Sequence, residues 1–135
     1  MDVVIDTNVI ITAMRSRYGA SNRLLQELAT GKTTVHISVP LFLEYAEVLL
    51  RFADIGVTEY TTILSFIDTI AIHHNIFFLF RKFLSDNDDD MILELAIKAN
   101  AQYIITYNIK DFKNAVQFGI IPITPKDYLQ LIGVL

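Results

Sequence analysis

Four acidic residues occupy comparable places along the chain, and their type and spacing could hold a divalent cation. Asp6 directly follows the run Val3–Ile5, which is typical of a buried strand. Glu44 lies one turn into a predicted helix, Asp90 opens another helix, and Asp111 lies in a turn after a later strand. Ligands of open α/β sheets collect at the carboxyl ends of the strands. We therefore expect these carboxylates to meet at one edge of a sheet.

A site built from carboxylates alone, without histidine or cysteine, suits Mg²⁺ or Mn²⁺ rather than zinc. Clustered carboxylates repel one another and raise each other's pKa unless a cation balances their charge. Phosphodiester cleavage uses such sites, because one or two metal ions activate water and stabilise the leaving oxygen. The sequence contains no Ser–His–Asp arrangement, glycine-rich phosphate loop or CxxC pair that competes with this interpretation.

Each acid also has a simpler interpretation that spacing alone does not exclude. Asp6 could cap the helix that follows it, because Asp is a favoured N-cap residue. Glu44 could be paired with a surface Lys or Arg, Asp88–Asp90 could form a solvated loop and cap, and Asp111 could be a turn residue. Asp90 opens a helix that precedes its strand, so it reaches the site only if that helix starts near the same edge.

The hydrophobic pattern predicts the elements that must position these acids. Strands are predicted for residues 3–5, 33–38, 103–106 and 120–123, with a buried strand or extended connection at 76–80. Helices are predicted after Asp6, over 21–30, 41–52, from 58 to about 73–75, and over 91–100 and 127–132, with a turn at 108–112. Because helices separate the strands, the sheet should be mainly parallel and covered on both faces.

The three histidines are expected to have structural roles. His36 lies inside a predicted strand, where a histidine satisfied by hydrogen bonds is commoner than a metal ligand. His73 and His74 fall at the predicted end of a helix, where they would complement the helix dipole.

Length and composition limit the classes of protein that fit. A chain of 135 residues predicts a single domain over residues 1–135. The net charge of −4 argues against a protein that coats nucleic acid, although a local basic rim is compatible with it. We expect no membrane span and no signal peptide, because the apolar runs are short and interrupted. The absence of cysteine fits a cytoplasmic protein.

The sequence resembles PIN domains in three blocks, VVIDTNVII, SVPLFLEYAEVLL and DNDDDMILELAIKANAQYIITYNIKDF. The resemblance runs from residue 2 to about residue 112, and its third block is long and specific. It is nearest to the prokaryotic branch of toxin components of toxin–antitoxin pairs, similar to the VapC toxins. It implies a PIN-like three-layer α/β/α sandwich with a central, mainly parallel sheet.

The resemblance also implies a set of residues that are both metal ligands and catalytic, namely Asp6, Glu44, Asp90 and Asp111. Asp111 matches the fourth acid in forms of the motif that read TxNxxDF, whereas many relatives carry Asp at the position of Asn108. The three consecutive aspartates leave Asp89 as an alternative to Asp90 as the third ligand. Asn8 and Thr106 match polar residues that orient the ligands.

The activity implied by the resemblance is that of a Mg²⁺- or Mn²⁺-dependent endoribonuclease acting on single-stranded or loop RNA. An antitoxin protein is the partner implied, and a homodimer is expected because such domains pair. The candidate phosphate contacts are Arg15, Arg17, Lys110 and Lys113, which are close in sequence to the acids but could be plain solvated charges. Tyr107, beside a strand end, could stack on a base or serve only in packing.

Two other functions remain open from the sequence. One is a PIN-like binding module that docks a partner and has little or no nuclease activity. The other is a phosphatase or phosphotransferase that uses Asp6 as a covalent nucleophile. That chemistry would favour a second aspartate two residues later, where Asn8 stands instead.

Overall fold

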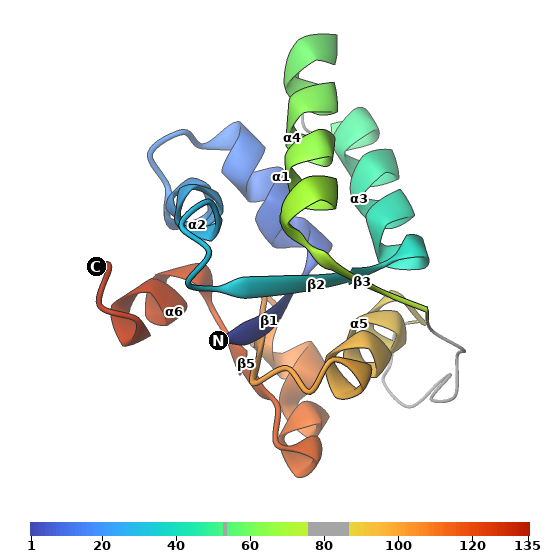
Figure 1. Cartoon of the computed structure of the whole chain (residues 1–135), viewed down its shortest axis with the longest axis vertical. Coiled ribbons are helices and arrows are strands. Elements are labelled where there is room, and N and C mark those ends of the chain that lie inside the picture. Colours follow the sequence, from blue (N-terminus) through green and yellow to red (C-terminus); the bar gives the residue numbers. More distant parts are fainter. Residues whose placement is uncertain (53, 76–86) are drawn as a thin grey trace.

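A five-stranded parallel sheet lies at the centre of the structure, a computed structural model that describes residues 1–52, 54–75 and 87–135 (Figure 1). The strand order is β3-β2-β1-β4-β5, and every neighbouring pair is parallel. The strands are β1 (Asp2–Ile5), β2 (Thr34–Ser38), β3 (Ile72–His74), β4 (Tyr103–Ile105) and β5 (Ile121–Ile123). The apolar run of β1 is completely buried because this strand is central and covered on both faces.

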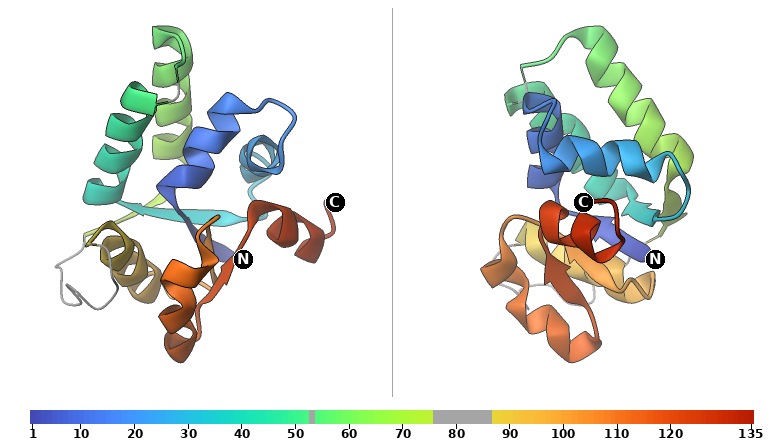
Figure 2. Two further views of the ribbon diagram at one scale, coloured as in Figure 1. Left: turned by 180° about the vertical axis from the view of Figure 1, so that it is seen from behind. Right: turned by 90° about the vertical axis from the view of Figure 1, so that its left-hand side faces the viewer.

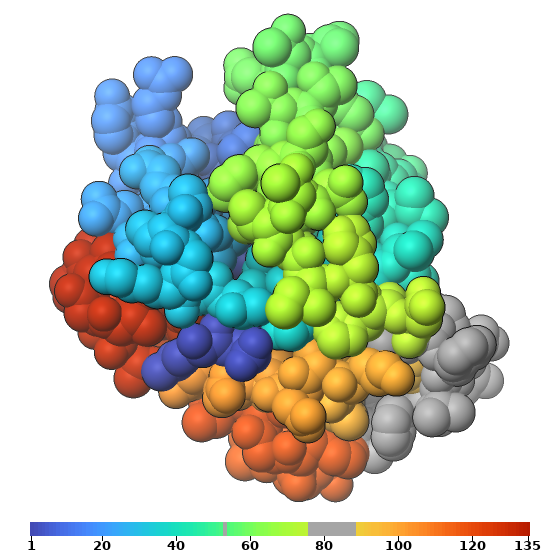
Figure 3. Space-filling view, viewed as in Figure 1, coloured from blue at the N-terminus to red at the C-terminus, as the bar shows by residue number. Residues whose placement is uncertain are grey.

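Helices cover both faces of the sheet, and this confirms the predicted three-layer α/β/α sandwich. They are α1 (Thr7–Arg15), α2 (Ala20–Leu28), α3 (Val39–Phe52), α4 (Val57–Ile70), α5 (Asn87–Lys98), the 3-10 helix η1 (Ile109–Phe118) and α6 (Pro125–Leu131). Helices α1 to α4 lie on one side of the sheet, and α5 and η1 lie on the other (Figure 2). In the space-filling view, α2 and α4 close over β2 (Figure 3). No helix in the described part of the chain is long and apolar enough to cross a membrane.

Most predicted elements are present, but several boundaries differ. Helix α3 begins two residues before its predicted start, α5 begins at Asn87 rather than Met91, and the predicted turn at 108–112 is the start of η1. The helix predicted to reach residues 73–75 ends at Ile70, because the next residues pair with β2 as strand β3. The strand or connection expected at 76–80 lies outside the described residues.

The strand β3 is held to the sheet by a chain of polar side chains as well as by its backbone. The buried His36 of β2 bonds through Nε2 to Oδ1 of Asp2 and through Nδ1 to Nε2 of His74, each at 2.8 Å. The prediction that His36 is a satisfied strand histidine is therefore confirmed. The prediction for His73 and His74 is wrong, since both belong to β3 rather than to a helix end.

His74 should make the stability of the protein fall in acid. Its pKa is lowered chiefly by burial, and further by the charges of His36, Lys98 and His73. In the unfolded chain its pKa returns to about 6.5. At a pH between the folded and the unfolded pKa of His74, the unfolded chain binds a proton at this residue and the folded chain does not. The contribution of His74 to the free energy of unfolding is therefore fully present above about pH 6.5 and is lost as the pH falls towards the folded pKa.

Urea unfolding at pH 7.5 and pH 5.5 measures this effect. The parent should lose more stability between the two values than His74→Gln, whose amide can still donate a hydrogen bond to His36. His73→Gln removes the exposed neighbouring imidazole and is the matched control. If both substitutions reduce the destabilisation between pH 7.5 and pH 5.5 by the same amount, the assignment of this effect to His74 is contradicted.

Candidate functional site

The carboxylate of Asp6 is held by the neighbouring strand rather than by the helix that follows it. Asp6 occupies the N-cap position of α1, but its side chain makes no capping hydrogen bond. Its Oδ2 instead accepts a hydrogen bond of 2.7 Å from Oγ1 of Thr106, and its backbone N–H donates to the carbonyl of Ile105. The simple interpretation of Asp6 as a helix cap is therefore not what the structure shows.

Thr106 joins three segments at the carboxyl ends of the strands. Its side chain is completely buried, and its backbone N–H donates to the carbonyl of Ile123 at the end of β5. Its hydroxyl oxygen also accepts a hydrogen bond of 2.9 Å from the backbone N–H of Asn108. One hydroxyl thus donates to Asp6 and accepts from the first turn of the loop after β4.

Helix α3 brings the charge of Glu44 towards the same strand end. Tyr45, the next residue, is buried, and its hydroxyl donates to the carbonyl oxygen of Ile5. Burial raises the pKa of Tyr45 most, and the negative charges of Asp6 and Glu44 raise it further. The hydrogen bond from Tyr45 to Ile5 fixes α3 against the end of β1, so Glu44 and Asp6 are each next in sequence to a residue of this contact.

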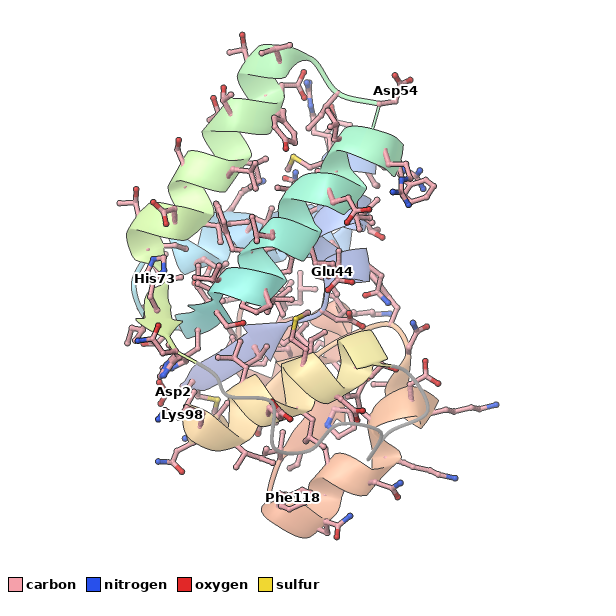
Figure 4. The ribbon with its side chains drawn as sticks, turned by 90° about the vertical axis from the view of Figure 1, so that its right-hand side faces the viewer. Asp2, Glu44, Asp54, His73, Lys98 and Phe118 are labelled. Carbon is pink, nitrogen blue, oxygen red and sulfur yellow. The ribbon has the colours of Figure 1, made fainter. Side chains whose placement is uncertain are left out.

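The direction of α5 determines whether Asp90 lies near the carboxyl ends of the strands. The chain leaves α5 beside the amino end of β1, where the N–H of Gln102 donates to the carbonyl of Asp2. A helix of 12 residues extends for about 18 Å, so α5 begins near the opposite edge of the sheet. Figure 4 agrees, because Glu44 of α3, a helix that contacts α5, lies towards the end of α5 away from Lys98.

Three carboxylates are buried in the first two turns of α5. Asp89, Asp90 and Glu94 are 9%, 2% and 4% exposed. Both aspartates are buried, so Asp89 and Asp90 each remain candidates for the third ligand. Sequence reasoning missed Glu94, although an acid one turn after Asp90 inside the apolar run MILELAIK was a usable signal.

The remaining predicted residues lie at the rim of this edge or away from it. Asp111, Lys110 and Lys113 are exposed on η1, and the backbone N–H of Asp111 donates to the carbonyl of Asn108. Arg15 lies at the other end of α1 from Asp6, where its guanidinium donates to the carbonyl of Phe52. Arg17 is exposed beyond that end of α1, so the structure does not bring either arginine beside Asp6.

The donors at this edge fit a hard divalent cation by their chemistry. All the acids named above offer oxygen, and carboxylate oxygens are the ligands that Mg²⁺ and Mn²⁺ prefer. In the first turn of α1, the buried Thr7 Oγ1 and Asn8 Oδ1 have no hydrogen-bond partner within the described residues. Across residues 1–52, 54–75 and 87–135, however, no three acidic or histidine side chains form a group ready to hold a metal ion. The ligand set therefore stays a prediction.

The fold and the site define a class of protein, namely parallel α/β/α sandwiches with buried carboxylates at the carboxyl ends of the central strands. The family model described as PIN domain matches residues 2–110, and the chain belongs to the PIN domain family.

A solved structure shares this fold. The chain is similar to a chain in the crystal structure of VapBC2 from Rickettsia felis bound to a DNA fragment from their promoter. The two are 20% identical with a TM-score of 0.66, over 92% of this chain and 98% of that chain. No curated protein matches the sequence.

Thr106→Val should destabilise the strand edge while keeping the shape of the side chain. The substitution removes the donor to Asp6 and leaves the N–H of Asn108 without its acceptor, at a cost of about 1–3 kcal/mol of unfolding free energy. Thr106→Ser keeps the hydroxyl and should recover most of the loss. Urea unfolding measures both variants, and a valine variant as stable as the parent would contradict this role.

Proposed function

We propose that this protein is an endoribonuclease that depends on Mg²⁺ or Mn²⁺ and cleaves single-stranded or loop RNA. The observation that carries the proposal is the Asp6 carboxylate at the carboxyl end of β1, which Thr106 orients, together with the buried acids at the start of α5. Membership of the PIN domain family supports the same activity. An oxygen-only donor set at this edge suits a cation that binds phosphate oxygens.

The chain's own residues have distinct roles in this proposal. Asp6, Glu44 and Asp90, with Asp89 as the alternative to Asp90, would hold the cation, and Glu94 and Asp111 would assist directly or through water. The bound cation would activate water for attack on phosphorus and stabilise the leaving oxygen. Thr106 fixes the orientation of the Asp6 carboxylate, and the side-chain Oδ1 of Asn8, two residues further along the chain, would offer a neutral oxygen ligand.

RNA binding should depend on a small basic rim rather than on the net charge. Lys110 and Lys113 are exposed on η1, which begins three residues after Thr106, so they are the better placed candidates for phosphate contacts. Arg15 and Arg17 are candidates only for RNA that extends past the far end of α1. With few cations near the site, binding should be weak and local.

We further propose that the protein is the toxin of a toxin–antitoxin pair and acts in the cytoplasm as a homodimer. The similar solved structure is a VapBC2 complex, which supports an antitoxin partner. An absence of cysteine and an RNA substrate fit the cytoplasm. Apolar side chains exposed on α3 and the start of α4 support pairing, namely Val39, Leu43, Leu50, Phe52 and Val57.

Asp6→Asn should abolish cleavage without weakening the metal-free fold. The variant keeps the acceptor for Thr106 but loses a charged ligand. Activity in Mn²⁺ should fall by more than the roughly 100-fold that loss of an outer-shell partner costs. The metal-free variant should unfold no more easily than the parent, because a repulsion between carboxylates is relieved. Millimolar Mn²⁺ should raise the melting temperature of the parent more than that of the variant.

Asp54→Asn is the matched control for this substitution. Asp54 is exposed at the far end of α3 from Glu44 (Figure 4), with a φ of 51° that asparagine adopts readily. It should keep the parental cleavage and thermal shift. An Asp6→Asn protein with both of these parental properties would refute the metal site. RNA binding without cleavage by the parent would instead favour a binding module.

The homodimer is tested by mass in solution. Light scattering at micromolar concentration should give the parent twice the chain mass of 15.4 kDa. Leu50→Lys places a charge on the exposed face of α3 and should give a monomer, because a buried unpaired charge opposes association. Leu131→Lys alters a leucine of α6 that is 50% exposed and should leave the mass unchanged. A monomeric parent contradicts the proposal.

A further inference from the structure

Tyr107 is anchored in an unusual way beside the candidate site. It follows β4 directly and stands between Thr106, which holds the Asp6 carboxylate, and Asn108. Its hydroxyl forms a hydrogen bond with Oγ of Ser21 on α2, a side chain that is completely buried. The residue itself is nevertheless 42% exposed.

This arrangement reverses the usual placing of a surface tyrosine. An exposed tyrosine normally buries its ring and keeps its hydroxyl in water. Here the hydroxyl is the end held by the protein interior, so the exposed part of Tyr107 includes apolar ring surface. Exposed ring surface beside a polar site is available to a flat ligand that stacks on it.

The side chain is anchored by its hydroxyl, and hydrogen bonds surround its place in the chain. Its backbone is fixed by the hydrogen bond from the N–H of Asn108 to Thr106, and its hydroxyl by Ser21. Helix α2 is in turn tied to α1, because Nδ2 of Asn22 donates to the carbonyl of Ala13 at 2.9 Å. A ring that is already ordered loses little freedom when a flat ligand stacks on it.

We propose that Tyr107 is the platform on which an unpaired RNA base stacks, next to the phosphate that the acidic edge cleaves. The inference rests on the proposed ribonuclease activity and adds to it the residue that selects single strands. A duplex hides the faces of its bases, whereas a single strand can turn one base onto the ring. Stacking accepts every base, so the contact selects unpaired RNA without selecting its sequence.

The test is a cycle that combines substitutions of Tyr107 with loss of a base. Binding is measured by fluorescence anisotropy with labelled single-stranded RNA, in Ca²⁺ rather than Mg²⁺ so that binding is measured apart from cleavage. A matched series of the same RNA carries one abasic nucleotide at each position in turn. Tyr107→Leu should weaken binding of the intact RNA between about fivefold and 100-fold. The parent should lose a similar factor with the abasic nucleotide at one position.

The two losses should not add, because they remove the same contact. If Tyr107→Leu weakens binding of intact and abasic RNA equally, or if the abasic penalty persists in full in that variant, the proposal is overturned. Tyr18→Leu is the matched control, since Tyr18 is 95% exposed in the loop between α1 and α2 and should leave binding unchanged. The same RNA annealed to its complement should not respond to Tyr107.

Two conservative variants keep the test valid if Tyr107→Leu folds poorly. Tyr107→Phe keeps the ring and removes the anchor, and Ser21→Ala removes the anchor from the other side. Each variant should weaken RNA binding by a smaller factor than Tyr107→Leu and should still bind the abasic RNA less tightly than the intact RNA. The loss of affinity in the double variant should be smaller than the sum of the two single losses, because both remove the same hydrogen bond. Cleavage of the intact RNA in Mn²⁺ is measured separately. If the Tyr107 and abasic losses are coupled but the RNA is not cleaved, the nuclease proposal is rejected and the base contact is kept. If the RNA is cleaved but the two losses are independent, the base contact is rejected and the nuclease proposal is kept.

Discussion

The hydrogen bond from Thr106 to Asp6 is the interaction on which the acidic edge depends. It joins the ends of two adjacent parallel strands, and the register that pairs Ile5 with Ile105 brings these two residues together. The same hydroxyl accepts the N–H of Asn108 and so sets the path of the loop that carries Tyr107. The orientation of a carboxylate and that of an aromatic ring therefore follow from one buried side chain.

The acidic edge contains carboxyl groups that are buried in the interior of the protein. Asp6, Asp89, Asp90 and Glu94 are all buried or nearly so, and a buried charge is costly unless it is paired or bound to a metal. The central strand β1 and the packed faces of α3 and α5 supply the apolar burial that holds these groups in place.

The order of elements and the parallel sheet could be predicted because apolar runs and helical periodicity are local properties. The boundaries that failed depend on distant residues: His73 and His74 join β3 only because β2 lies beside them. Asp6 and Glu44 could be placed from their positions after strands, whereas Asp90 needed the direction of α5. Glu94 was missed because an acid in an apolar helix has no strand end to mark it. The anchor of Tyr107 was not predictable, since Ser21 lies 86 residues away.

The strand order also has a consequence for how the protein is made. Strand β1 is the first of the five strands along the chain and occupies the middle of the sheet, whereas its neighbour β4 begins only at Tyr103. Contacts between residues so far apart in sequence form late, because the intervening chain must first be enclosed. Asp6 emerges from the ribosome 100 residues before its hydrogen-bond donor, Thr106. A nascent or truncated chain that lacks β4 therefore cannot assemble this edge.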